Sequence, residues 1–206
     1  MTLTPGSTSK MTGSNKQMSV TPSNMPELGL PAPDFALPDT DGEIVSRDHY
    51  SESPAFLVVF WCNHCPYVQH IRAGFVDFAE YYQTQGLAVV AIMPNDVDAQ
   101  PADSPENMKR AAVEFGFTFP YLYDETQEVA RVYQAACTPD FFLYDRNRRL
   151  AYRGRFDASR PNQGVSVTGS DLRAATNSVL AGQSLSPEQA PSIGCNIKWT
   201  PGNEPK

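Results

Sequence analysis

The sequence has 206 residues, of which 23 are acidic and 16 are basic, so its formal net charge is -7 at pH 7. This balance argues against a basic face that neutralises nucleic-acid phosphates. No stretch approaches the roughly 18 consecutive apolar residues of a membrane-spanning helix, and the N-terminal part lacks the apolar segment of a secretory signal. We therefore expect one cytoplasmic globular unit with neither nucleic acid nor a membrane as partner.

The two ends of the chain differ from its middle in composition. Residues 1–27 are mostly Ser, Thr, Gly, Asn and Pro, and so few apolar side chains cannot offset the entropy lost on ordering. We predict that this segment is a disordered tail. Residues 28–185 are expected to form the folded domain, and residues 186–206, which show no long hydrophobic period, an extension that packs on its surface.

The first half of the domain alternates between strand and helix patterns. A hairpin is predicted around the turn residues DTDG at 39–42. The continuous apolar runs at 55–61 and 87–93 are typical of strands buried on both faces of a sheet. Between them, apolar residues recur at steps of three and four over 68–82, which predicts a helix.

The second half closes with a different order of elements. Helices are predicted over 104–115 and 125–136, with a short strand-like segment at 116–124 between them. Two strands around a polar turn follow at 140–156, and a last helix at 170–182. This order predicts an α/β fold in which a mixed sheet is sandwiched between helices.

Two cysteines, Cys62 and Cys65, stand in the stretch WCNHC at the beginning of the first long helix. The free N–H groups and the positive dipole end of a helix start stabilise an anion, and a thiolate is the anion available. We therefore predict that Cys62 is an attacking thiolate and that Cys65, one turn away, resolves the mixed disulfide. A charged His64 between them would lower the pKa of Cys62 further.

The same motif has other interpretations. Two thiols at this spacing can be structural, or they can supply half of a closed zinc site, which needs four ligands. A second such pair, or a spaced pair of histidines, is missing from the sequence, and His70 is interpreted as an ordinary helix-face residue. We accordingly predict no metal, although Cys137 and Cys195 could still complete a ligand set in space.

Pro139 directly precedes a predicted buried strand in the stretch ACTPDFFLYD. A proline there cannot be an ordinary ladder residue, and X-Pro bonds are where cis peptides occur. By pattern alone it is a proline at a strand entry, with trans the commoner isomer.

Taken together, these features resemble the thioredoxin superfamily. The strand that leads into WCNHC, the later TP before a strand, and the closing hairpin plus helix are similar to its core. The stretch PAPDFALPDTDG and the inserted helix resemble its redoxin (AhpC/TSA-like) branch, and the pairing of CNHCPYV with SIGCNIKW resembles a peroxiredoxin-like subgroup of thioredoxin-family proteins. The resemblance runs from about residue 28 to residue 200.

The resemblance implies a thioredoxin-like three-layer fold whose catalytic pair is Cys62 and Cys65. It also implies tuning or substrate-positioning roles for residues beside the pair and in the loop that faces it: Trp61, Asn63, His64, Thr138 and Pro139. It raises the expectation of a cis bond before Pro139 and places Cys137 close to the site. The implied enzyme is a thiol-disulfide oxidoreductase with no organic cofactor. Its partners would be protein or small-molecule disulfides and a separate thiol reductant.

The sequence departs from two patterns of the superfamily. Peroxiredoxins carry a Pro and a Thr or Ser seven and three positions before their reactive cysteine; counted back from Cys65, these positions hold Val58 and Cys62. The peroxide-binding set is therefore broken, and thiol peroxidase stays an alternative function, as does a non-catalytic metal-binding or redox-sensing module. Thioredoxins also carry a buried Asp in the strand before the pair, whereas 55–61 contains no acid, which leaves the proton acceptor for Cys65 unassigned.

Two further cysteines, Cys137 and Cys195, admit two interpretations. They can be small buried hydrophobes. Alternatively they form an auxiliary couple, because Cys137 stands beside the expected cis-proline loop and the C-terminal segment with Cys195 could fold back to meet Cys137 or the CNHC pair.

Overall fold

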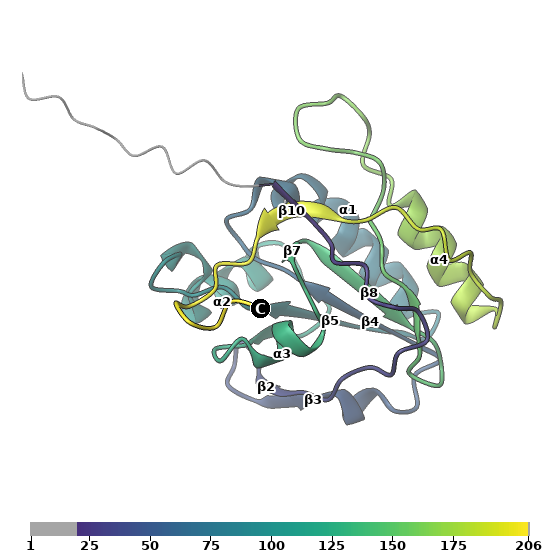
Figure 1. Cartoon of the computed structure of the whole chain (residues 1–206), viewed down its shortest axis with the longest axis horizontal. Helices are drawn as coiled ribbons and strands as arrows, with labels where there is room; N and C mark the ends of the chain where they lie inside the picture. The colour runs from purple at the N-terminus through teal and green to yellow at the C-terminus, as the bar shows by residue number, and fades with distance from the viewer. Residues whose placement is uncertain (1–19, 206) are drawn as a thin grey trace, which may run out of the picture.

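A computed structural model of the protein describes residues 20–205 and shows a central sheet with helices on both faces (Figure 1). The five strands lie in the order β6-β5-β4-β8-β9. Their bounds are Ala55–Phe60 for β4, Leu87–Met93 for β5, Tyr121–Tyr123 for β6, Asp140–Tyr144 for β8 and Leu150–Tyr152 for β9. Strand β5 is parallel to β4 and β6, whereas β8 is antiparallel to β4 and β9. The predicted α/β fold with a mixed sheet is confirmed.

The helices divide the interior into two clusters of buried side chains. The helices are α1 (Pro66–Gln83), α2 (Pro105–Glu114), α3 (Glu128–Val132) and α4 (Ser170–Leu180), with 3-10 turns η1 (Arg47–Tyr50) and η2 (Pro101–Asp103). Residues of α1, α2 and α4 pack with Leu57 and Val59 on one face of β4, and residues of α3 pack with Phe56 and Val58 on the other. Because β4 is covered on both faces, all six of its residues are buried.

Helix α3 is shorter than the predicted span 125–136. Gln127 and Gln134 take left-handed backbone conformations, with φ of 62° and 57°. Such residues interrupt a right-handed helix. Of the residues between them, only the five of Glu128–Val132 are therefore helical, which is little more than one turn.

The predicted hairpin is present as β2 (Ala36–Pro38) paired with β3 (Ile44–Ser46). Gly42 in its turn has φ of 86°, a conformation that favours glycine. The hairpin places Leu37 against the cluster that contains α3.

A second, three-stranded sheet joins both ends of the described chain. Strand β10 (Ile193–Asn196) pairs with β1 (Val20–Pro22) on one side and with β7 (Cys137–Thr138) on the other. In Figure 1, β10 and the segment from β1 run alongside one another above the central sheet. This sheet brings the C-terminal segment to the loop that precedes β8.

This sheet corrects both predictions for the chain ends. Residues 1–19 of the expected disordered tail lie outside the described residues, but Val20–Pro22 form a strand. Its backbone groups are paired with β10, a partner more than 160 residues away that local composition cannot reveal. The C-terminal segment likewise does more than cover the surface, since Cys195 and Ile197 are 2% and 1% exposed.

No helix within the described part of the chain is long and apolar enough to cross a lipid bilayer.

Candidate active site

The CNHC stretch connects the end of β4 to the start of α1. Trp61 extends the sheet, because its N–H donates to the carbonyl of Ile92 at 2.8 Å. Its indole is buried against Phe75 of α1, with 5.0 Å between the ring centroids. Cys65 then occupies the N-cap position of α1, and Pro66 is the first helical residue. This proline suits the position because the first N–H groups of a helix have no partner within it.

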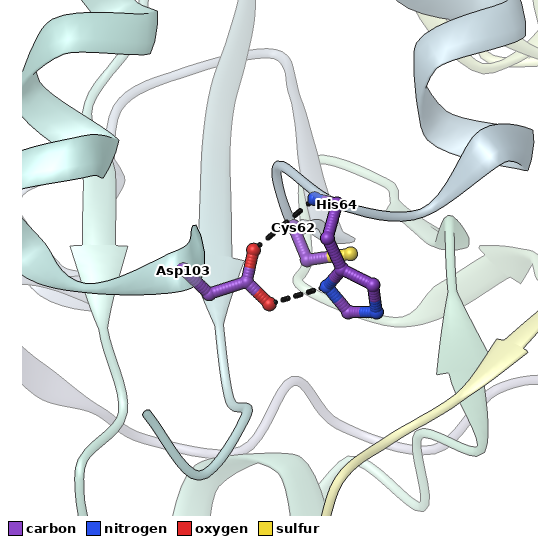
Figure 2. Close-up of side chains that lie close together, drawn as sticks. All are labelled: Cys62, His64 and Asp103. Atoms are coloured by element: carbon purple, nitrogen blue, oxygen red, sulfur yellow. Dashed lines mark hydrogen bonds and ion pairs between the residues drawn. The ribbon is translucent and has the colours of Figure 1, made fainter. Parts of the chain in front are cut away.

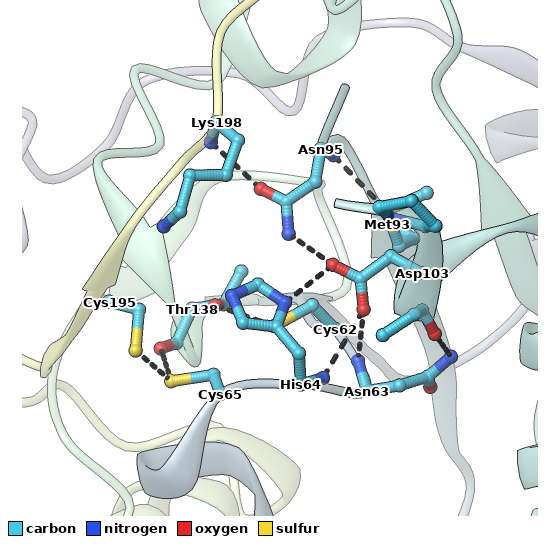
Figure 3. Close-up of polar contacts among 12 residues, drawn as sticks. Cys62, Asn63, His64, Cys65, Met93, Asn95, Asp103, Thr138, Cys195 and Lys198 are labelled. Atoms are coloured by element: carbon cyan, nitrogen blue, oxygen red, sulfur yellow. Dashed lines mark hydrogen bonds and ion pairs between the residues drawn. The ribbon is translucent and has the colours of Figure 1, made fainter. Parts of the chain in front are cut away.

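Both sulfurs of the pair meet the loop that precedes β8. Cys62 Sγ lies 3.0 Å from Thr138 Oγ1, and Cys65 Sγ lies 3.2 Å from the carbonyl oxygen of Thr138 (Figure 3). The peptide bond between Thr138 and Pro139 is cis. The structure thus brings together the two motifs that the sequence analysis singled out.

The anion-stabilising position at the helix start belongs to Cys65 and not to Cys62. The neighbouring Cys195 and Cys62 side chains lower the pKa of Cys65, and the backbone N–H of Val68 in the first helical turn adds to the effect. Burial raises the pKa of Cys62 well above its ordinary value, and the nearby carboxylate of Asp103 raises it further. The prediction of a lowered pKa at Cys62 is therefore wrong, because this thiol precedes the N-cap by three residues.

Of the two additional cysteines, Cys195 joins the pair. Its sulfur is 2.6 Å from Cys65 Sγ (Figure 3). The Cys137 thiol instead faces the carbonyl of Pro139 at 3.6 Å, and burial raises its pKa well above the ordinary value. Within residues 20–205 no hydrogen bond joins Cys137 to another sulfur, whereas Cys195 contacts Cys65.

His64 is held by a buried carboxylate that the sequence analysis missed. Asp103 is 0% exposed, and its Oδ2 lies 2.6 Å from His64 Nδ1 (Figure 2). The same oxygen accepts from Asn95 Nδ2 at 2.8 Å, and Oδ1 accepts from the backbone N–H groups of Asn63 and His64. Four donors thus surround this carboxylate, which fixes the CNHC loop and the imidazole together.

The sequence offers little to single out Asp103. It follows a Pro-Ala dipeptide in the acid-rich segment between β5 and α2, where Asp96 and Asp98 look equivalent to it. Only the tertiary structure separates the buried acid from the partly or fully exposed ones.

The predicted site residue Asn63 anchors the loop, and His70, interpreted from the sequence as a helix-face residue, contacts another part of the chain. The Asn63 side chain donates to the carbonyl of Ala102 at 3.1 Å and accepts from the Tyr121 hydroxyl at 3.2 Å. His70 lies on α1, with its Nε2 3.0 Å from Ser159 Oγ. Asn63 is therefore placed to hold the loop, and His70 is bonded away from the thiols.

Three groups of the site could contact a metal ion. One candidate ligand atom each from Cys62, His64 and Asp103 lies within 4.8 Å of the other two (Figure 2). A closed zinc site needs a fourth ligand, and the Asp103 oxygens already accept four hydrogen bonds. The arrangement fits a hydrogen-bonded imidazole better than a metal centre.

The thiols are inaccessible in this conformation. Cys62 and Cys65 are 0% exposed and Cys195 is 2% exposed. A disulfide substrate could reach them only after part of the surrounding structure moves.

Comparison with known proteins assigns the family. The family model described as AhpC/TSA family matches residues 28–153, which is more than half of the chain. The chain therefore belongs to the AhpC/TSA family, a redoxin-type group within the thioredoxin superfamily, and its fold is thioredoxin-like.

Curated relatives with assigned names are similar over part of their length. ResA, a thiol-disulfide oxidoreductase of Geobacillus thermodenitrificans, is 28% identical over 60% of this chain and 66% of its own length. A Mycobacterium tuberculosis protein named as a peroxiredoxin is 32% identical over 52% of this chain and 63% of its own length. The chain thus spans just under two thirds of these relatives.

Two solved structures match nearly the whole chain. A hypothetical protein of Sinorhizobium meliloti 1021 is 52% identical, with a TM-score of 0.87 over 88% of this chain and 100% of the other. An uncharacterized conserved protein of Geobacillus kaustophilus is 49% identical, with the same TM-score over 90% of this chain and 98% of its own.

Proposed function

We propose that the protein is a thiol-disulfide oxidoreductase whose redox couple is Cys62 and Cys65. One observation carries this proposal. The sulfurs of Cys62 and Cys65, which stand just before and at the start of α1, both contact Thr138 of the facing loop. Two thiols held side by side can cycle between a dithiol and a disulfide without an organic cofactor.

The site suggests how the two thiols divide the reaction. Cys62 attacks a substrate disulfide, its proton passes to His64, and one substrate sulfur leaves as a thiolate. The Cys65 thiolate then attacks Cys62 Sγ, which forms the Cys62–Cys65 disulfide and releases the second substrate sulfur. The lowered pKa of Cys65 favours this second step. A separate thiol reductant restores the dithiol.

Asp103 serves as a positioning residue in this scheme. Its Oδ2 fixes the His64 ring at 2.6 Å, beside the Cys62 sulfur. The pair of His64 and Asp103 supplies a proton acceptor for Cys62 that β4, which contains no acid, does not provide.

The test is multiple-turnover reduction of a protein disulfide such as that of insulin, with dithiothreitol as reductant. Cys62→Ser and Cys65→Ser should each lower the rate at least about 100-fold, because each removes a sulfur that forms a covalent bond in the cycle. Cys137→Ser is the matched control, since it removes an equally buried thiol outside the pair. Equal rates for all three variants would refute the proposal.

Thiol peroxidase is the second candidate function. The ionised sulfur at the helix start would attack a hydroperoxide, become sulfenic acid and be resolved by a neighbouring thiol. The family and the peroxiredoxin-like relative favour this activity, whereas Val58 and Cys62 at the positions counted back from Cys65 disfavour it. Stopped-flow oxidation by hydrogen peroxide distinguishes the two candidate functions. A rate constant no greater than that of free cysteine would exclude thiol peroxidase activity.

A metal-binding module is the third candidate, on account of the Cys62, His64 and Asp103 cluster. Elemental analysis of protein purified under reducing conditions decides it. One metal per chain, lost in Cys62→Ser, would favour this function over catalysis.

A further inference from the structure

Cys65 is the central member of a group of three sulfurs. Cys195 Sγ approaches it to 2.6 Å from β10. Cys62, three residues earlier in the chain, meets the same residue as Cys65, because Thr138 Oγ1 lies 3.0 Å from Cys62 Sγ and the Thr138 carbonyl oxygen lies 3.2 Å from Cys65 Sγ. Within the described residues, a hydrogen bond joins Cys65 to Cys195, and none joins Cys62 to Cys195 (Figure 3). Cys65 is therefore in place to exchange a disulfide between two partners.

The position of Cys195 depends on an unusually close approach of two strands. Cys195 stands opposite Thr138 in the ladder between β10 and β7. A Cβ atom on the preceding residue, Gly194, would lie 2.0 Å from the Thr138 carbonyl oxygen, a distance that no side chain tolerates. Glycine at this position lets β10 approach the cis-proline loop closely enough for the sulfurs to meet.

Hydrogen bonds on both sides of β10 hold the strand in this register. Before it, the carbonyl of Ser192 accepts from the N–H of Ser23 at 2.9 Å. After it, the N–H of Lys198 donates to Asn95 Oδ1 at 2.9 Å, and the carbonyl of Lys198 accepts from the N–H of Asp96. Asn95 also donates to Asp103, which contacts His64. The Asn95 side chain therefore contacts both the segment after β10 and the carboxylate that holds His64.

We propose that Cys195 is a third redox thiol, which takes over the disulfide from the CNHC pair. This inference rests on the proposed function. After a substrate has been reduced, Cys195 attacks Cys65 Sγ of the Cys62–Cys65 disulfide. The Cys65–Cys195 bond forms, the Cys62–Cys65 bond breaks, and the proton of Cys195 passes to the departing Cys62 sulfur.

This exchange is balanced within the chain. One disulfide and one thiol are present before and after it, so it consumes no electrons. The external thiol reductant of the proposed cycle then supplies two electrons and two protons to the Cys65–Cys195 disulfide. The exchange returns Cys62 to its thiol form while the chain is still oxidised, and it covalently joins β10 to the start of α1.

Disulfide mapping of the full chain tests the proposal. Reduced protein is treated with increasing oxidised glutathione, its free thiols are blocked with N-ethylmaleimide, and it is digested with trypsin without reduction. Cys62 and Cys65 share the tryptic peptide 48–72, Cys195 lies in 174–198, and Cys137 lies in 132–146. We expect peptides 48–72 and 174–198 to be joined, and the joined species to persist in Cys62→Ser, where Cys65 is the one cysteine left in 48–72.

Controls make the outcomes distinct. Cys137→Ser should leave the joined species unchanged, and Cys195→Ser should abolish it and lower multiple turnover at least fivefold. A wild-type protein that forms the Cys62–Cys65 disulfide but never the joined peptides would overturn this proposal and leave the proposed function intact. A protein that forms neither disulfide would overturn both. The mapping of Cys62→Ser does not require that a Cys195 variant fold.

Discussion

At the scale of single residues, the carboxylate of Asp103 connects the CNHC loop, the His64 ring and Asn95 through hydrogen bonds. The spacing of Cys62 and Cys65 follows from local pattern; in the structure Cys65 is the N-cap of α1, whereas Cys62 lies three residues before it. Asp103 could not be predicted, because its burial results from contacts with the CNHC loop some 40 residues earlier. Local pattern also could not show which of the two thiols has the lower pKa, because these pKa values depend on the distant residues Cys195 and Asp103.

The first prediction concerns Asp103→Asn. An amide at this position must turn its NH₂ group toward donors, either the two backbone N–H groups or His64 and Asn95. Buried donors without acceptors cost about 1–3 kcal/mol each, so we expect a loss of about 2–4 kcal/mol in the free energy of unfolding. Urea denaturation measures it, with the exposed Asp98→Asn as control. Equal stability of the two variants would contradict the assigned hydrogen bonds.

The second prediction concerns Asp140, which is 0% exposed and has no hydrogen-bond partner for its Oδ1. Burial raises its pKa to about 7, whereas an unfolded chain ionises this group near pH 4. Between these values the folded state binds more protons, so stability should fall as pH rises from about 4 to 7 and then level off.

Asp140→Asn removes this pH dependence. Relative to the wild type, the variant should be more stable at pH 8 than at pH 4, by a difference of about 2–4 kcal/mol in the free energy of unfolding. Denaturation at both pH values measures it, with the exposed Asp77→Asn as control. A variant whose stability follows the wild type at both pH values would show that Asp140 does not titrate in this range.

At the scale of elements, the spacing of apolar residues predicted the positions of the main strands of the central sheet and of the long helices well. Strands β4 and β5 and helix α1 lie within the predicted spans or within two residues of them. The three-residue β1 and four-residue β10 escaped prediction, because strands this short show no period and gain their partners from distant parts of the chain.

Strand β10 also bears on substrate access. It pairs with β7, so that Cys195 stands opposite Thr138, the residue to which the family resemblance assigns substrate positioning. An extended substrate can pair with this residue only if β10 moves away first.

Gly194→Ala tests the role of β10. The added methyl group cannot fit against the Thr138 carbonyl, so we expect β10 to be displaced and Cys195 to react with iodoacetamide at least about ten times faster, through local opening. Gly42→Ala is the control, because it strains a distant turn, with φ of 86°, where an added Cβ has no neighbour within 4 Å. Unchanged protection of Cys195 would show that β10 does not depend on this close approach.

At the scale of the whole molecule, the fold was predictable because its central sheet alternates with helices of clear period, and solved structures about half identical in sequence share it. Local pattern did not fix how the C-terminal segment reaches the thiols, where β10 pairs with β7 and brings Cys195 to Cys65. Because Cys62 and Cys65 are buried, the proposed cycle requires an opening step.

Truncation measures what this closure contributes. A chain that stops after residue 190 lacks β10, the buried Ile197 and the Trp199 side chain that packs against the α3 cluster. At about 1.5–3 kcal/mol for each large apolar side chain, we expect a loss of about 3–6 kcal/mol in the free energy of unfolding, together with faster alkylation of Cys65. A chain that stops after Asn203 is the control. Equal stability of the two truncated chains would mean that the segment adds nothing to the fold.

Titration of the CNHC couple with glutathione redox buffers tests the central claim most directly. The fraction of peptide 48–72 that has lost two hydrogen atoms, summed with the fraction joined to 174–198, is measured by mass spectrometry at each potential. We predict a reversible two-electron transition with a midpoint between about -120 and -270 mV, the range of thioredoxin-fold oxidoreductases, and its loss in Cys65→Ser. Thiols that stay reduced across this whole range, or a transition that survives Cys65→Ser, would contradict the account.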